Sequence, residues 1–186
     1  MPVEPVEVAV IGTGWCGGIR AETLSRYPLV KKLHVCEIRR DRLKEIQQLT
    51  HAAVATADYQ DIVKNDAVKV VYISTTPEST HFPIARDCLK AGKHVQVEIP
   101  LADNLKDAES VVALAGQSGL VAMCGHTRRF NPSHHYVRNQ IAAGNFNILQ
   151  MDVQTYFFRR TNTNALGQPR SWTDHLLWHH AAHTVD

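Results

Sequence analysis

Three glycines near the N-terminus have the spacing of a nucleotide-binding loop. Gly12, Gly14 and Gly17 follow a Val-rich apolar run at 6–11 and precede a segment with helical spacing. In such a loop the first glycine permits a tight turn and the second lets the backbone approach a pyrophosphate. The third lets the helix pack on the strand, and the N–H groups at the helix start bind the phosphates. The pattern favours a dinucleotide site, with a merely tight turn as the alternative.

An acidic residue follows the second apolar run at the distance that such a site needs. Glu37 lies 20 residues after Gly17, where a carboxylate can accept hydrogen bonds from the ribose hydroxyls of a dinucleotide. Its charge would repel the 2′-phosphate of NADP, which favours NAD. Arg39 and Arg40 follow directly and could bind that phosphate instead, so both cofactors remain open.

Histidine and arginine are concentrated in the last third of the chain. Residues 125–186 hold seven of the eleven histidines and six arginines, no lysine, and three acidic residues. His179 and His183 are four residues apart on a predicted helix and therefore share a face. Because histidine titrates near neutral pH, the pair could handle protons, and the family resemblance given below implies His183 as a general base and His179 as its partner. A zinc pair and simple core packing are the alternatives, and because the glutamate of an HExxH motif is absent we predict no metal.

The arginines of this region favour the binding of anions, and the family resemblance given below implies a small carboxylate substrate. Planar guanidinium groups bind carboxylates through two parallel hydrogen bonds. The substrate-binding residues that we predict are His126, Arg128, Arg129, Arg159 and Arg170, with Arg128 as the first choice.

The elements that must position these residues alternate along the first two thirds of the chain. Predicted strands lie at 6–11, 33–38, 53–56, 68–73, 94–98 and 120–124, and predicted helices separate them, beginning with 19–27 and 40–49. This alternation predicts an α/β fold, a Rossmann-type doubly wound parallel sheet, over residues 1–124. Residues 125–186 predict a helix at 132–143, an alternating strand at 148–158, a polar loop at 161–170 and a helix from 173 or 174 to 186. One strand and two helices do not complete a domain, so we interpret 125–186 as the first part of a truncated α+β substrate domain.

Composition excludes several classes of protein. The 186 residues carry 20 basic and 18 acidic side chains, and a net charge of +2 argues against binding to nucleic acid. No apolar run approaches the roughly 20 residues of a membrane helix, and the first residues lack the pattern of a secretory signal. We therefore expect a cytoplasmic protein without a membrane partner. The four cysteines are scattered, which predicts reduced, buried thiols.

The sequence resembles the Gfo/Idh/MocA family of NAD(P)-dependent oxidoreductases. The resemblance rests on the glycine loop, on Ser74-Thr75-Thr76-Pro77 with His81, on 92–100 and on 125–132. It implies that Thr76 and Pro77 flank the cofactor and that the strand ending at Pro100 delivers a catalytic group to the nicotinamide. That group is a lysine in the family pattern Glu-Lys-Pro, whereas this chain has Ile99, which cannot transfer a proton. The cofactor-binding residues that we predict are Gly12, Gly14, Trp15, Cys16, Gly17, Glu37, Thr75, Thr76, Pro77, His81 and Glu98.

Residues 93–186 further resemble one subfamily, which oxidises the cyclic hemiacetal of a carboxylated semialdehyde to a pyrone dicarboxylate in aromatic catabolism. The resemblance implies a dehydrogenase that uses NAD or NADP, acts on a small carboxylate and, when full-length, forms a homo-oligomer. A truncated, inactive NAD(P)-binding module, a dehydrogenase of a sugar-like or cyclitol-like substrate, and a subunit piece stable only within an oligomer are the alternatives.

Overall fold

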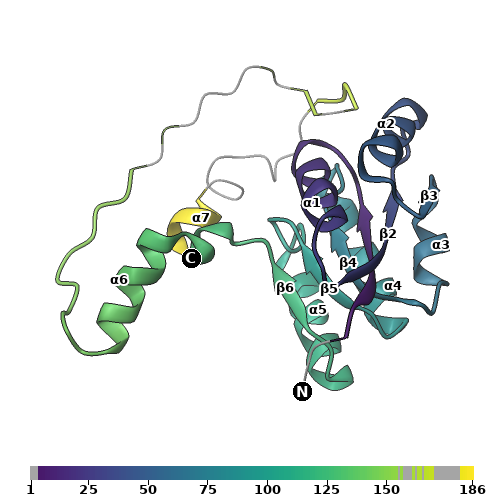
Figure 1. Ribbon diagram of the computed structural model, residues 1–186. Helices are drawn as coiled ribbons and strands as arrows, with labels where there is room; N and C mark the ends of the chain where they lie inside the picture. Colours follow the sequence, from purple (N-terminus) through teal and green to yellow (C-terminus); the bar gives the residue numbers. More distant parts are fainter. Residues whose placement is uncertain (1–3, 155, 157–160, 162, 165, 170–180) are drawn as a thin grey trace.

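A computed structural model of the chain describes residues 4–154, 156, 161, 163–164, 166–169 and 181–186 (Figure 1). In chain order the elements are β1 (Val6–Ile11), α1 (Trp15–Ser25), β2 (Val30–Cys36), α2 (Arg40–Thr50), β3 (Val54–Thr56), α3 (Tyr59–Val63), β4 (Val68–Ile73), a 3-10 turn η1 (Glu78–Thr80), α4 (His81–Lys90), β5 (His94–Val97), α5 (Leu105–Ser118), β6 (Ala122–Cys124), a 3-10 turn η2 (Thr127–Phe130), α6 (Pro132–Ala142) and α7 (Ala182–Val185).

The six strands form one parallel sheet in the order β3-β2-β1-β4-β5-β6. The order reverses between β1 and β4, whose ends pair Ile11 with Ile73. The two halves of the sheet therefore wind in opposite directions from this point, and a crevice opens at the carboxyl ends of β1 and β4. The predicted Rossmann-type doubly wound sheet is confirmed.

Helices cover both faces of the sheet, which explains the continuous apolar strands. On one face, Val10 of β1 packs with Ala21 of α1 and Ile46 of α2. On the other face, Ala9 of β1 packs with buried side chains from α3, α4 and α5, among them Ile84 of α4. The strand β1 is thus buried from two sides, which fixes the position of its end at the crevice.

Local signals explain several element boundaries. The Asn104 side chain accepts a hydrogen bond from the backbone N–H of Asp107 and begins α5, and Gly119, with φ of 65°, ends it. The Asn131 side chain begins α6 in the same way. The first helix starts earlier than predicted: α1 begins at Trp15, directly after Gly14, because the glycine loop leads into the helix without a linker.

Past residue 124 the structure departs from the predicted strand. Residues 148–154 and 156 form no strand, so the prediction of a strand at 148–158 is wrong over these positions. A strand needs a neighbour to receive its backbone hydrogen bonds, and among the described residues no strand pairs with this segment. The helix predicted from 173 or 174 is described only at its end, as α7, and its first residues lie outside the described residues. The division into domains at 124 and 125 stays a prediction.

Within the described part of the chain, no helix is long and apolar enough to cross a membrane. The four cysteines form no disulfide: Cys36 and Cys88 are buried, and Cys16 and Cys124 are half-buried. Burial raises the pKa of Cys36 and of Cys88 to about 12, so both thiols stay protonated at neutral pH.

The packing of α2 against the sheet predicts a large loss of stability when its core side chain is shortened. Ile46 is fully buried, whereas Leu49 on the same helix is 49% exposed. We expect Ile46→Ala to lower the free energy of unfolding by roughly 2–5 kcal/mol, measured by urea denaturation. Leu49→Ala, the matched control, should lower it by less than about 1 kcal/mol. Equal losses would contradict the assignment of Ile46 to the core.

Candidate functional site

A cavity of about 320 Å³ lies at the crevice between β1 and β4. The loops after these strands are tied together, because the N–H of Ser74 donates to the carbonyl of Ile11 over 2.8 Å. The N–H of Gly12 donates to the carbonyl of Cys36 at the end of β2, also over 2.8 Å. The volume is within the usual range for small-molecule sites. The residues lining the cavity are Ile11, Gly12, Gly14, Cys36, Glu37, Ile38, Arg39, Ala57, Asp58, Tyr59, Ser74, Thr75, Thr76, Thr80, Pro83, Ile84 and Leu166.

Two of the predicted glycines are required by close backbone packing. Gly12 has a φ of 82°, and a Cβ atom there would lie 2.5 Å from the carbonyl oxygen of Ser74. A Cβ atom on Gly17 would overlap the carbonyl oxygen of Gly12. Gly14 is different, because a Cβ atom there would meet nothing within 4 Å. Gly14 faces open space on the cavity wall, as expected where a ligand's phosphates approach the backbone.

The start of α1 offers uncompensated N–H groups beside Gly14. Gly14 is the N-cap and supplies no side-chain hydrogen bond to the helix, whose first turn carries no acidic residue. Such a helix start attracts anions through its N–H groups and its dipole. The adjacent Trp15 side chain is 83% exposed and does not line the cavity.

Glu37 lines the cavity and receives hydrogen bonds from two sides. The N–H and hydroxyl of Thr13 donate to Oε2 over 3.0 and 3.1 Å. The backbone N–H and Nε of Arg39 each donate to Oε1 over 3.1 Å, and Nη2 of Arg39 lies 3.4 Å from Oε2. The carboxylate therefore ties the glycine loop after β1 to the segment that follows β2.

The charge of Glu37 is stabilised by these donors. Burial raises the pKa of the carboxyl, but the hydrogen bonds from the side chain and backbone of Arg39 and from the Thr13 N–H outweigh burial, and the pKa lies below its ordinary value. The hydrogen bond between the two side chains also raises the pKa of Arg39. Both groups are therefore ionised at neutral pH.

The opposite wall is made by the loop after β4, which His81 supports. The buried His81 ring places Nδ1 at 2.7 Å from the Pro100 carbonyl oxygen and Nε2 at 3.0 Å from the Thr75 carbonyl oxygen. The hydroxyls of Thr75 and Thr80 are 2.6 Å apart. His81 thus joins the loops after β4 and β5, while Thr75 and Thr76 form the cavity surface.

Six of the predicted cofactor residues do not line the cavity. They are Trp15, Cys16, Gly17, Pro77, His81 and Glu98. Gly17 and His81 instead shape the loops that do, and Glu98 forms an ion pair of 3.4 Å with Arg20 of α1. Burial and the charge of Glu98 raise the pKa of Cys16. Direct contact of these six residues with the cofactor stays a prediction.

The cavity fits a dinucleotide. The glycine loop leaves room for phosphates against the backbone, the start of α1 supplies N–H donors, and apolar side chains such as Ile38, Pro83 and Ile84 supply a wall for a flat base. The residues Gly12, Gly14, Glu37, Thr75 and Thr76 would hold it. Bound there, a nicotinamide dinucleotide supplies a hydride acceptor.

A second cluster joins η2 to α7. Nε of Arg129 donates to Oδ1 and Oδ2 of Asp186 over 2.8 Å each, and Nη2 donates to Oδ1 over 2.6 Å. Nδ1 of His126 lies 3.7 Å from Oδ2 of Asp186. The His126 and His183 rings meet edge to face with centroids 6.3 Å apart. Arg129 holds the pKa of Asp186 below its ordinary value, so this carboxylate is a fixed negative charge beside two histidines.

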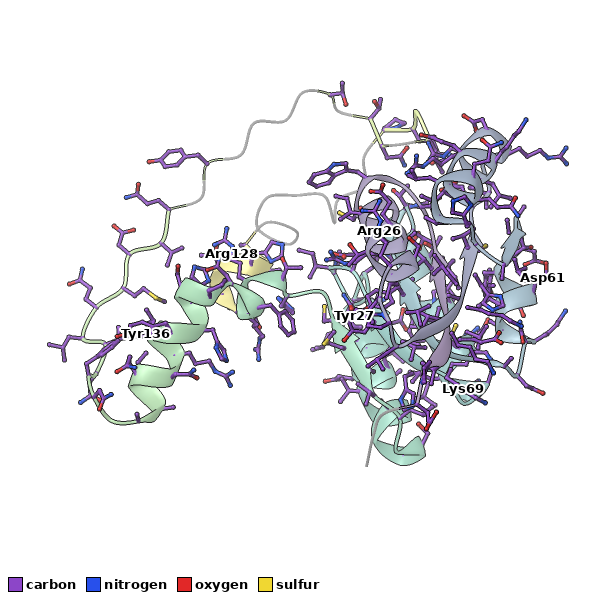
Figure 2. The ribbon with its side chains drawn as sticks, in the orientation of Figure 1. Arg26, Tyr27, Asp61, Lys69, Arg128 and Tyr136 are labelled. Carbon is purple, nitrogen blue, oxygen red and sulfur yellow. The ribbon has the colours of Figure 1, made fainter. Side chains whose placement is uncertain are left out.

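The cluster changes the interpretation of the predicted arginines. Nε and Nη2 of Arg129 are bound to Asp186, so the positive charge of this guanidinium is already paired with a carboxylate. Arg128 extends from η2 beside α7 (Figure 2) and forms no ion pair among the described residues. Arg159, Arg170 and His179 lie outside the described residues. In the part of the chain that the structure describes, no three His, Cys, Asp or Glu side chains are placed to hold a metal ion.

Sequence reasoning missed three residues of these networks. Thr13 is fully buried, and its carbonyl accepts a hydrogen bond of 2.8 Å from Nε of Arg42 on α2. Nothing in the sequence marks Arg42 or Asp186 as a partner, because both contacts join segments far apart in the chain. The position of Thr13 between Gly12 and Gly14 is a signal that could have identified it, because a polar side chain in this tight loop is expected to need a buried partner.

The glycine geometry predicts that alanine at position 14 and alanine at position 17 have different effects on NADH binding and on thermal stability. Gly14→Ala should keep the melting temperature and weaken NADH binding by about tenfold or more, because the new methyl group occupies the space where the phosphates approach. Gly17→Ala should lower the melting temperature as well, because its Cβ atom overlaps backbone. Gly116→Ala on α5, where a Cβ atom meets nothing within 4 Å, should leave NADH binding unchanged and should not lower the melting temperature, because alanine favours a helix more than glycine does. Titration followed by nicotinamide fluorescence measures NADH binding, and thermal melting measures stability. Unchanged NADH binding in Gly14→Ala would exclude this loop as the phosphate site.

The lowered pKa of Glu37 predicts a pH-dependent contribution to stability. Because the folded pKa lies below the unfolded one, the carboxylate stabilises the fold above the unfolded pKa, and this stabilisation is lost as the pH falls through the folded pKa. The difference in unfolding free energy between the wild type and Glu37→Gln should therefore shrink between about pH 6 and pH 3. Urea denaturation at several pH values measures this. A difference independent of pH would show that the charge contributes nothing.

Known proteins resemble the chain over most of its length. The chain is 49% identical over 181 residues to 4-carboxy-2-hydroxymuconate-6-semialdehyde dehydrogenase of Sphingobium sp., a match that covers 97% of this chain and 57% of that protein. It is 34% identical over 143 residues to inositol 2-dehydrogenase of Rubrobacter xylanophilus, which covers 76% of this chain and 41% of that protein. The chain thus spans about half the length of these relatives.

Solved structures share the fold. Scyllo-inositol dehydrogenase from Lactobacillus casei, with bound NAD(H) and scyllo-inositol, matches with a TM-score of 0.71 at 22% identity over 76% of this chain and 42% of that chain. GenD2 from gentamicin A biosynthesis, in complex with NAD, matches with a TM-score of 0.68 at 32% identity over 76% of this chain and 39% of that chain.

Two family models match the chain itself. Residues 6–126 match the oxidoreductase family with an NAD-binding Rossmann fold, and residues 132–186 match the C-terminal region of bacterial oxidoreductases. The first match covers the whole sheet, the glycine loop and every residue of the cavity lining except Leu166. The chain belongs to the Gfo/Idh/MocA family of oxidoreductases, whose cofactor is a nicotinamide dinucleotide.

Proposed function

We propose that the protein oxidises the cyclic hemiacetal of 4-carboxy-2-hydroxymuconate-6-semialdehyde to 2-pyrone-4,6-dicarboxylate, in aromatic (protocatechuate) catabolism, with NAD or NADP as the acceptor. The observation that carries the proposal is the 49% identity to the Sphingobium dehydrogenase. This identity extends over 181 residues, 97% of the chain. Oxidation of the hemiacetal carbon removes a hydride and the hydroxyl proton, and leaves a cyclic ester.

The proton needs an acceptor other than residue 99. Ile99 is 7% exposed and has no ionisable group. Histidine accepts protons near neutral pH, and His183 lies edge to face with His126 beside the ionised Asp186. We therefore assign His183 as the base for the hydroxyl proton, with His179, four residues earlier in the chain, as its partner. Asp186 would stabilise the positive charge that the histidines gain.

The carboxylates of the substrate need positive charge that is not already neutralised. Arg128 suits this role, because it forms no ion pair among the described residues, whereas Arg129 is bound to Asp186. We propose that Arg128 binds a substrate carboxylate and that Arg129 holds Asp186 in place. His126 would contribute from the same side. Arg159 and Arg170 remain predicted contacts.

A cyclitol or sugar-like substrate is the second candidate, supported by the 34% identity to inositol 2-dehydrogenase. An NAD(P)-binding module without turnover is the third. Cytoplasmic localisation and homo-oligomer formation stay predictions.

Substrate oxidation tests these candidates. The protein containing this chain is incubated with NAD or NADP and either the semialdehyde or scyllo-inositol, and reduced cofactor and pyrone dicarboxylate are measured by absorbance and mass spectrometry. Turnover of the semialdehyde with formation of the pyrone supports the proposal. Turnover of the inositol alone, or dinucleotide binding with no turnover of either substrate, would overturn it.

The role of His183 predicts a selective loss of rate. His183→Ala should lower kcat by about 10²–10⁴-fold, the contribution of a positioned general base, and leave the Kd for NADPH unchanged. His134→Ala, at an exposed position on α6, serves as the matched control and should leave both unchanged. If His183→Ala keeps its full kcat, another group accepts the proton.

A further inference from the structure

One residue of the cavity lining comes from a distant part of the chain. Leu166 lines the cavity, whereas the other lining residues all lie between Ile11 and Ile84. The sequence predicts 125–186 as the start of a substrate domain, so a residue of that region forms part of the wall of the dinucleotide cavity. Leu166 is not among the residues that the sequence predicts for the cofactor or for the substrate.

Leu166 belongs to a tight turn that is held together by its own hydrogen bonds. This turn, which we call the Asn164 turn, comprises the described residues 163, 164 and 166–169 and is yellow-green in Figure 1. Oδ1 of Asn164 accepts the N–H of Leu166 over 2.9 Å and the N–H of Gln168 over 3.1 Å. The N–H of Asn164 donates to the carbonyl of Gln168 over 2.8 Å, and Gly167, with φ of 75°, donates its N–H to the carbonyl of Asn164 over 3.0 Å. The Asn164 side chain therefore fixes the position of Leu166 within the turn.

The Asn164 turn reaches the cavity through an apolar side chain. Among the residues that the structure describes, no hydrogen bond or ion pair joins this turn to the sheet or to its helices. Asn164 and Leu166 are half-buried, and the other described residues of the turn are exposed. An apolar contact has no preferred direction. The turn can therefore change its distance from the cavity wall without breaking one of these hydrogen bonds.

The cavity lies where a Rossmann fold holds the adenosine half of a dinucleotide. The segments after β2 and β3 supply lining residues such as Ile38 and Tyr59, whereas the segments directly after β5 and β6 supply none of the described lining. In this fold the phosphates lie at the start of the first helix, and a ribose lies beside the acidic residue after the second strand, here Glu37. The adenine base attached to that ribose would therefore lie in the cavity, and the nicotinamide would lie beyond it, towards β5 and β6.

The apolar side chains of this cavity have surface left for a base to cover. Ile38 is 63% exposed although it lines the cavity, and Leu166 is half-buried. The faces of a purine ring are flat and largely apolar, so contact with Ile38 and Leu166 would remove apolar surface of all three groups from water.

We propose that the Asn164 turn closes over the adenosine half of the bound dinucleotide, with Leu166 covering the adenine base. The proposal rests on the nicotinamide dinucleotide site of the proposed function and adds to it a binding residue from the predicted substrate domain. Asn164 is the positioning residue that holds Leu166 in place. Binding of the cofactor thereby fixes the Asn164 turn against the sheet.

Binding titrations test the proposal without catalysis. The reduced cofactor that the wild type binds, NADH or NADPH, is titrated into the protein containing this chain and followed by nicotinamide fluorescence. It is then displaced by ADP-ribose or by ADP-ribose 2′-phosphate, which contain the adenosine half and lack the nicotinamide. Leu166→Ala should weaken the binding of both ligands by about five- to tenfold and by similar factors, because apolar contact with the base is lost.

Leu105→Ala is the matched control. Leu105 begins α5, is 69% exposed and does not line the cavity. Its replacement removes the same atoms as Leu166→Ala and should leave both affinities unchanged. A melting temperature without ligand confirms that each variant is folded.

Asn164→Ala tests whether the turn acts through Leu166. This variant removes the acceptor for the N–H groups of Leu166 and Gln168 and leaves the Leu166 side chain in the protein. It should weaken both ligands in the same direction as Leu166→Ala and by no larger a factor. The double variant should bind as Leu166→Ala does, within about twofold, because the two residues act as one unit.

Four results would overturn the proposal. They are unchanged binding in Leu166→Ala, weaker binding of the dinucleotide with unchanged binding of the ADP-ribose ligand, an equal loss in Leu105→Ala, and fully additive losses in the double variant. The second of these would place Leu166 at the nicotinamide half instead. If the wild type binds neither NADH nor NADPH, the cofactor site on which the proposed function depends is itself wrong.

Discussion

The close approach of α1 to the end of β1 is the constraint on which the site depends. The carbonyl oxygen of Gly12 occupies the space that a side chain on Gly17 would need, and Gly12 itself lies against the carbonyl of Ser74 after β4. Backbone thus packs directly on backbone at the point where the strand order reverses. As a result, the start of α1, with its unbonded N–H groups, lies at the crevice between β1 and β4. Figure 1 shows the helix rising directly from the loop.

A buried polar network keeps this backbone arrangement in one conformation. Thr13 is held through its N–H and hydroxyl by Glu37 and through its carbonyl by Arg42. An ionised carboxylate is stable in a buried place only when its oxygens are well bonded, and Glu37 meets that condition. The network also links the loops after β1 and β2 to α2. A shift of α2 would therefore change the position of the glycine loop. The bonds that preorganise the loop also fix the carboxylate of Glu37 on the wall of the cavity.

The cluster between η2 and α7 shows that two residues with the same predicted role have different partners in the structure. Arg128 and Arg129 are neighbours in the chain and were predicted to act together on the substrate. In the structure Arg129 is bound to Asp186 and Arg128 is not. The prediction of a strand at 148–158 is wrong over the described positions because it, too, depended on a partner from elsewhere in the fold. An alternating pattern indicates one apolar face, but a strand forms only beside another strand. For the described residues 148–154 and 156, that partner is absent.

Local pattern determined the doubly wound sheet, the glycine loop, the placement of Glu37 after the second strand and the presence of His126 and His183 in the last third. These features follow from spacing of a few residues, which apolar periodicity and glycine positions record directly. Tertiary structure alone decided which donors saturate Glu37, that Arg42 holds Thr13, and that Asp186 takes the guanidinium of Arg129. Each of these contacts joins segments that are distant in the chain or leaves a choice among several donors. Such a choice is settled by which groups the folded sheet and helices bring within about 3 Å of one another.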